Sequence, residues 1–81
     1  VLAADSEALK RNNGTVAASV ALTWVKFSNT TTGVQALLKT GLSTNGSGIF
    51  TTTDAGLTPG VTYRIDWRES GGQIGSAEKA A

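Results

Sequence analysis

The chain has 81 residues, with seven Lys and Arg against six Asp and Glu, and it contains no Cys and no His. A formal net charge of +1 argues against binding to nucleic acid and against polybasic membrane docking. No apolar run approaches the roughly 20 residues that a membrane-spanning helix needs. Because the commonest general base, thiol nucleophile and metal ligand are all missing, we expect no enzymatic activity, no cofactor and no metal site.

The first segment, residues 1–12, is expected to be an N-terminal arm. Residues 3–10 are compatible with one capped helical turn, with an extended arm or with an edge strand, and the sequence leaves these alternatives open. Asn12, Asn13 and Gly14 follow as a turn signal. Twelve Thr, seven Ser and ten Gly in the whole chain are typical of a β protein rich in turns.

Residues 16–27 give the strongest strand signal. Alternate residues place one apolar set on one face, namely Val16, Ala18, Val20, Leu22 and Trp24. Val25 and Phe27 fall on the opposite face. The apolar register therefore switches near Trp24, which predicts either a β-bulge or a strand that is buried on both faces.

A loop over residues 28–33 leads into a predicted strand over residues 34–42. Asn45 and Gly46 then form a strong turn signal, because both residues tolerate positive φ. We therefore expect a hairpin in which residues 49–53 return alongside residues 34–42. Pro59 and Gly60 suit the two central positions of the next turn.

Residues 61–68 alternate cleanly, with Val61, Tyr63, Ile65 and Trp67 on one face and polar side chains on the other. A turn at residues 70–72 leads to a last strand over residues 73–77, and residues 78–81 are expected to be a frayed tail. Five to seven short strands predict an all-β, small antiparallel β-sandwich over residues 13–77.

Two segments resemble a known pattern: Thr44-Asn45-Gly46-Ser47-Gly48-Ile49-Phe50 and Leu57-Thr58-Pro59-Gly60-Val61-Thr62-Tyr63. They are similar to carboxypeptidase-regulatory and prealbumin-like (Ig-like) β-sandwich modules, in which a turn leads into Gly-x-Phe and Leu-x-Pro-Gly-x-x-Tyr enters a core strand. The resemblance covers about residues 16–68. It implies an accessory domain of a surface protein or larger assembly, with no catalytic residues. The composition also resembles small accessory proteins of tailed-phage virions.

Two functions follow as hypotheses. The first is a non-catalytic structural module, such as a capsid decoration or tail-associated protein on a virion or another extracellular surface. It is expected to be homo-oligomeric or present in several copies, and to dock to neighbouring protein subunits. Its predicted contact residues are Val1, Leu2, Leu9, Val25 and Phe27. The alternative is an adhesion module that stacks a glycan on Tyr63 and Trp67, although these rings also fit a core. The carboxylates of Asp54, Asp66 and Glu69 are interpreted as surface charges.

Overall fold

The computed structural model describes residues 6–52 and 57–81. Every regular element in these residues is a β-strand. In chain order the strands are β1 (Ser6–Ala8), β2 (Leu22–Asn29), β3 (Gln35–Lys39), β4 (Ile49–Thr51), β5 (Thr62–Glu69) and β6 (Ile74–Ala80). The all-β class predicted from the Thr-rich and Gly-rich sequence is confirmed.

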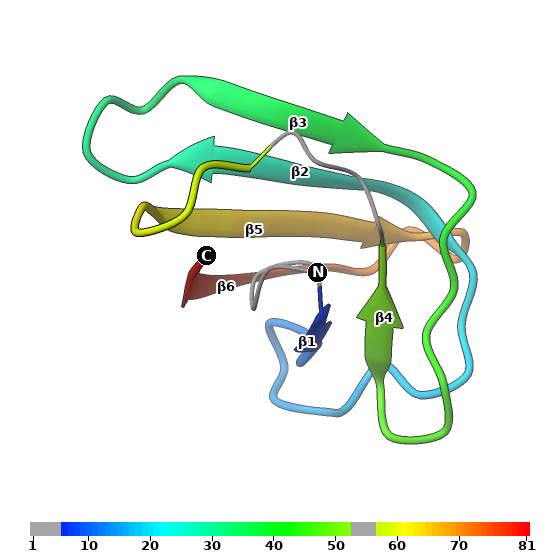
Figure 1. Ribbon diagram of the computed structural model, residues 1–81. Helices are drawn as coiled ribbons and strands as arrows, with labels where there is room; N and C mark the ends of the chain where they lie inside the picture. The colour runs from blue at the N-terminus through cyan, green and yellow to red at the C-terminus, as the bar shows by residue number, and fades with distance from the viewer. Residues whose placement is uncertain (1–5, 53–56) are drawn as a thin grey trace.

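Four of the strands form one antiparallel sheet in the order β3-β2-β5-β6 (Figure 1). The central pair, β2 and β5, aligns Val25 with Trp67 and Phe27 with Ile65. On β5, Tyr63, Ile65 and Trp67 are buried while the residues between them face outward. The predicted alternation of this strand is confirmed because one face of the sheet is packed and the other is solvated.

A register shift between Leu22 and Trp24 interrupts the pairing of β2 with β5. Leu22 opposes Glu69 and Trp24 opposes Arg68, so β2 carries one extra residue at Thr23. The predicted bulge is present, just before the expected position, and it reverses the inward and outward positions. Leu22 and Val25 therefore both point inward although they are three residues apart.

The strand begins later than expected, at Leu22 instead of residue 16. Residues 16–21 make only isolated bridges, from Lys10 to Val16 and from Ala21 to Ser43. Ser19 has a φ of 53°, a left-handed conformation that does not continue a strand. Alternation of small apolar residues alone could not reveal this break.

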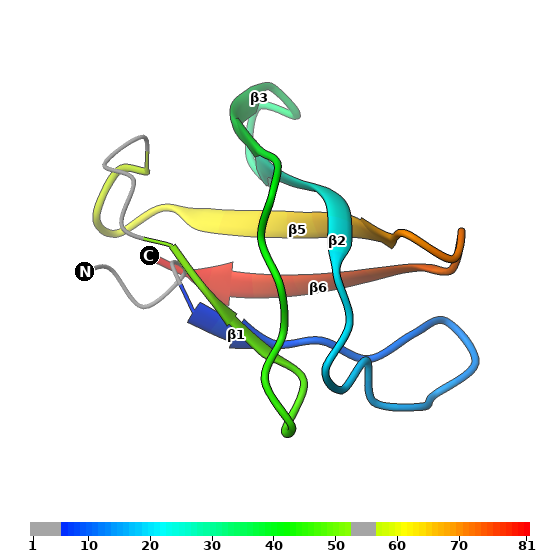
Figure 2. The ribbon, with the colours of Figure 1, turned by 90° about the vertical axis from the view of Figure 1, so that its right-hand side faces the viewer.

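The inward face of the four-stranded sheet shares its core with residues outside this sheet. These residues belong to the two-stranded ladder of β1 and β4 and to irregular segments beside it. In Figures 1 and 2 this ladder lies at an angle to β5 and β6. The Phe50 ring of β4 meets the Phe27 ring of β2 edge to face, with centroids 6.1 Å apart. The shared core is completed by Leu9, Ala17, Leu22, Val25, Leu57, Tyr63, Ile65 and Trp67.

The predicted hairpin between residues 34–42 and 49–53 is wrong. β3 belongs to the four-stranded sheet and β4 to the two-stranded ladder. The turn itself is present, because the Gly48 amide donates to the Asn45 carbonyl at 3.0 Å. The Leu22 amide donates to the Leu42 carbonyl and the Thr44 amide donates to the Val20 carbonyl, so this segment leaves the sheet alongside residues 20–22 and cannot fold back on β3.

Both ends of the described chain are more ordered than the sequence suggested. Ser6–Ala8 forms a strand, so the edge-strand alternative holds for this part of the expected arm. Leu9 is fully buried, and residues 6–12 are thus part of the domain. The expected frayed tail at 78–81 is wrong: β6 runs to Ala80, and the Ala81 amide donates to the Val61 carbonyl at 2.9 Å.

Candidate functional site

The predicted glycan-stacking rings lie inside the protein. Tyr63 is 2% exposed and Trp67 is 0% exposed. The Tyr63 hydroxyl accepts a hydrogen bond from the Thr58 amide at 2.9 Å, which fixes the Pro59–Gly60 turn at the start of β5. The prediction that these two rings stack a sugar is therefore wrong, and their role is to fill the core and to position this turn.

The predicted contact residues are also in the core. Leu9, Val25 and Phe27 are each 0% exposed, so their side chains offer no surface to another subunit in this fold. The bulge at Thr23 explains the error, because it turns Val25 and Phe27 toward the core instead of leaving a strand apolar on both faces. Val1 and Leu2 lie outside the described residues, as does Asp54.

The outward face of the four-stranded sheet, called the open face below, is the better candidate. On its two central strands, Trp24 lies beside Arg68, Lys26 beside Asp66 and Ser28 beside Arg64. Trp24 and Lys26 are half-buried, and the Arg64 side chain is 59% exposed. On the outer strands the face adds two exposed apolar side chains, Leu38 beside Lys26 and Ile74 beside Arg68.

A shallow hollow surrounds the Trp24 side chain on this face. Its lining combines two hydroxyls, an amide, an ammonium group, a leucine and the indole: Thr23, Trp24, Lys26, Gln35, Leu38 and Thr40. The Lys26 Nζ lies 5.9 Å from the centroid of the Trp24 ring, within reach of a cation–π attraction. An aromatic ring with polar neighbours can contact either a protein or a sugar ring.

Next to this hollow, the charges of the open face are arranged in a network across β5 and β6. The Arg64 Nε donates to the Asp66 carboxylate at 3.1 Å and to the Ser76 hydroxyl at 3.2 Å. The Ser76 hydroxyl in turn donates to Asp66 at 3.0 Å. The expectation that Asp66 is a surface strand charge is consistent with this network, which joins neighbouring strands across the sheet.

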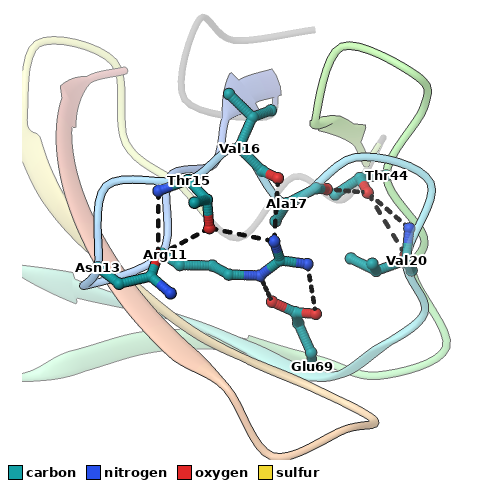
Figure 3. Close-up of polar contacts among 8 residues, drawn as sticks. All are labelled: Arg11, Asn13, Thr15, Val16, Ala17, Val20, Thr44 and Glu69. Atoms are coloured by element: carbon teal, nitrogen blue, oxygen red, sulfur yellow. Dashed lines mark hydrogen bonds and ion pairs between the residues drawn. The ribbon is translucent and has the colours of Figure 1, made fainter.

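Glu69, by contrast, is not a surface charge. It continues the inward row of β5 beyond Trp67, and its side chain is 7% exposed. Arg11 binds it with two nitrogens, Nε and Nη2, the second at 3.0 Å (Figure 3). This hydrogen bonding holds the pKa of Glu69 below its ordinary value. An ionised carboxylate already occupied by a guanidinium suits a structural link and not proton transfer.

The Arg11 guanidinium also holds its own loop. Its Nη1 donates to the Thr15 hydroxyl and to the Val16 carbonyl, both at 3.2 Å (Figure 3). The ion pair thus ties the loop at residues 11–16 to the end of β5. The period-2 pattern of residues 61–68, continued by one step, would have placed Glu69 inward, but no pattern in the chain indicates Arg11 as its partner.

Thr44 makes a second buried polar link (Figure 3). Its side chain is almost fully buried, and its hydroxyl accepts a hydrogen bond from the Val20 amide at 3.0 Å and donates to the Ala17 carbonyl. These bonds satisfy backbone groups of residues 17–20, where no regular ladder exists to pair them.

Neither a metal cluster nor a membrane-spanning helix is present in the described residues. Among the side chains that the structure describes, no group of three or more acidic residues lies close enough together to hold a metal ion. In the same part of the chain, no helix has the length and apolar character to cross a membrane. No protein-family model matches the chain, and searches of curated proteins and of solved structures found no similar protein.

Proposed function

We propose that this protein is a non-catalytic structural module that docks onto protein subunits of a larger assembly through the open face of its sheet. A virion or another extracellular surface is the setting proposed from the sequence, and a small β-sandwich of the prealbumin-like kind is the proposed fold family. The observation that carries the proposal is the position of Trp24. Trp24 lies on the solvated face of the sheet, lines the same hollow as exposed Leu38, and shares a row with exposed Ile74 on the far side of Arg68. A tryptophan in such surroundings is typical of a contact surface.

The polar part of the open face supports the same function. A standard protein interface combines a few aromatic and aliphatic anchors with a polar surround that includes arginine. Here Arg68 lies in one row between Trp24 and Ile74, and Arg64 lies two rows further along the same strand. Within residues 6–52 and 57–81, the clearly perturbed ionisable groups belong to the Arg11–Glu69 pair, which already has a structural role.

Incorporation into the native assembly tests this proposal. Tagged wild-type chain and the Trp24→Asp variant are expressed in the source cells, and the copy number of each in purified particles is measured by quantitative mass spectrometry. We expect a fixed copy number for the wild type and at least a tenfold loss for Trp24→Asp. Val16→Asp is the control, since Val16 is 45% exposed but lies outside the four-stranded sheet. Equal incorporation of all three chains would refute the proposal.

A second candidate function is carbohydrate binding at Trp24. The favouring observation is the hollow beside the indole, whose lining also includes the hydroxyl and amide side chains of Thr23, Gln35 and Thr40. A glycan array with wild type and Trp24→Ala tests it. Specific signals that disappear in Trp24→Ala but persist in Val16→Ala would establish sugar binding, whereas an array without specific signals would exclude this alternative.

A further inference from the structure

The outward side chains of the two central strands follow a regular pattern. Row by row, β2 and β5 set Trp24 beside Arg68, Lys26 beside Asp66 and Ser28 beside Arg64. In the first row an aromatic ring is next to a cation, and in the second a cation is next to an anion. In both rows, the side chain on β2 and the side chain on β5 therefore attract each other.

From this pattern we propose that the open face binds a second copy of this chain, face to face, about a twofold axis that runs between β2 and β5 and parallel to them. Such an axis places β2 of each copy over β5 of the other and keeps every row in place. Lys26 then faces Asp66 of the second copy, and Trp24 faces Arg68 of the second copy. The inference rests on the proposed docking function and names the partner.

Charge complementarity favours a second copy over an unrelated partner. Five charged side chains lie on the rows of the open face, three positive and two negative: Lys26, Arg64, Arg68, Asp66 and Glu78. A face of one sign would attract a partner of opposite charge, whereas this face has both signs on paired strands. In a symmetric complex each ion pair and each cation–π contact occurs twice.

The size of the face predicts a weak complex. The four strands are five to eight residues long. At about 4.8 Å between strands and about 3.3 Å per residue they cover about 440 Å² per copy. The total of about 900 Å² is just below the roughly 1,000 Å² expected of a stable specific interface. Packed sheets are rotated by about 30° relative to each other, so the side chains near the centre of the face keep their facing partners best. Lys26 and Asp66 occupy the middle row and are thus the most diagnostic pair.

Complementary charge reversal tests the inference. Lys26→Glu places a carboxylate opposite the Asp66 carboxylate of the second copy, and Asp66→Lys places an ammonium group opposite the Lys26 ammonium group of the second copy. Each variant alone has like charges opposed, and we expect its self-association to weaken at least tenfold relative to wild type. In an equimolar mixture both facing pairs become opposite in charge, so the heterodimer should form within about threefold of the wild-type Kd.

Sedimentation equilibrium up to about 1 mM protein measures the self-association of the wild type, of each single variant and of the equimolar mixture. Far-UV circular dichroism checks that each variant is folded. Restored association on mixing cannot arise from a change within one chain, which makes the test independent of any loss of stability. A wild type that stays monomeric over this range overturns the inference, as do single variants that dimerise like wild type. A third result also overturns the inference: association that is abolished by Leu38→Pro but unchanged by the charge reversals. That result assigns the contact to the β3 edge.

The outcomes separate this inference from the proposed function. If the wild type is monomeric but its incorporation into particles still depends on Trp24, the partner is not a second copy and the docking function stands. If the single variants fail to dimerise and their mixture dimerises, but incorporation into particles does not depend on Trp24, the dimer is established. Docking to the assembly through this face is then excluded.

Discussion

Replacing Gly75 by alanine should destabilise the fold through a direct clash. Gly75 lies opposite Trp67 in the β5–β6 pairing, and the buried indole extends across it. A Cβ at this position would be 2.6 Å from the Lys10 carbonyl oxygen and 2.6 Å from Cε2 of Trp67, and closer still to Cζ2. Ordinary contact begins at 3.4 Å, so the carbonyl would have to move by about 0.8 Å (3.4 − 2.6) and the indole by more.

The cost is expected near the upper end of the range for overpacking, about 2–3 kcal/mol. The ring is fully buried and the carbonyl belongs to the backbone beside the Lys10–Val16 bridge, so neither can move alone. With a urea m-value of about 1 kcal/mol/M for a domain of this size, the unfolding midpoint should fall by about 2–3 M. Urea titration followed by far-UV circular dichroism measures this shift.

Gly71→Ala is the matched control, since a Cβ there meets nothing within 4 Å. Both substitutions restrict the unfolded chain alike, so the difference between them isolates the clash. In a Trp67→Phe background the smaller ring should relieve part of the effect, with a coupling energy of about 0.5–3 kcal/mol. If Gly75→Ala and Gly71→Ala unfold at the same urea concentration, the indole does not cover Gly75 and the reasoning is refuted.

Three further changes probe the polar links and one tight turn. Thr44→Val removes a buried hydroxyl that hydrogen-bonds two backbone groups, and it should lower the free energy of unfolding in urea by about 1–3 kcal/mol. Thr62→Val on the exposed face is the control and should change this free energy by no more than about 0.5 kcal/mol. Equal effects of the two substitutions would contradict the assigned role of the hydroxyl. The lowered pKa of Glu69 means that its link to Arg11 contributes fully above the ordinary carboxyl value of 4.5 and is lost as the pH falls through the folded-state pKa. Thermal unfolding from pH 7 to pH 2 should therefore show a smaller acid-dependent loss in Glu69→Gln than in wild type, and parallel curves would exclude the link as its source. Gly48→Ala should be destabilising for two reasons, a φ of +77° and a Cβ position 2.6 Å from Val16 Cγ1, and a melting temperature equal to that of wild type would show that this turn adapts freely.

How far sequence patterns predict this structure depends on the range over which each pattern acts. The turns predicted from local sequence are confirmed. Asn13–Gly14 and Pro59–Gly60 form these turns, with φ of 89° at Gly14 and 84° at Gly60. Strict alternation along β5 identified its buried side correctly. These features are determined by a few neighbouring residues, which the sequence displays directly.

Long-range pairing was harder to predict. Asn45–Gly46 predicts a turn but does not specify which strands pair beside it, and here the flanking strands enter different sheets. Because of the one-residue bulge at Thr23, Val25 and Phe27 face the core and Trp24 faces solvent. The sequence patterns instead predict Val25 and Phe27 as contact residues. The sequence patterns therefore do not indicate the candidate site, because they place Trp24 on one apolar face with Leu22.

The central pairing of β2 with β5 has a kinetic consequence. Leu22 and Glu69, which meet at one end of this pair, are 47 residues apart in the chain (69 − 22). The intervening residues supply β3 and β4, so the middle of the sheet closes only after a large loop has formed. Proteins dominated by such distant pairings fold in roughly milliseconds to seconds, not in microseconds. During that time β5 can pair locally with β6, but its row of Tyr63, Ile65 and Trp67 lacks its neighbour β2. This exposed row should make the refolding yield of the domain sensitive to protein concentration.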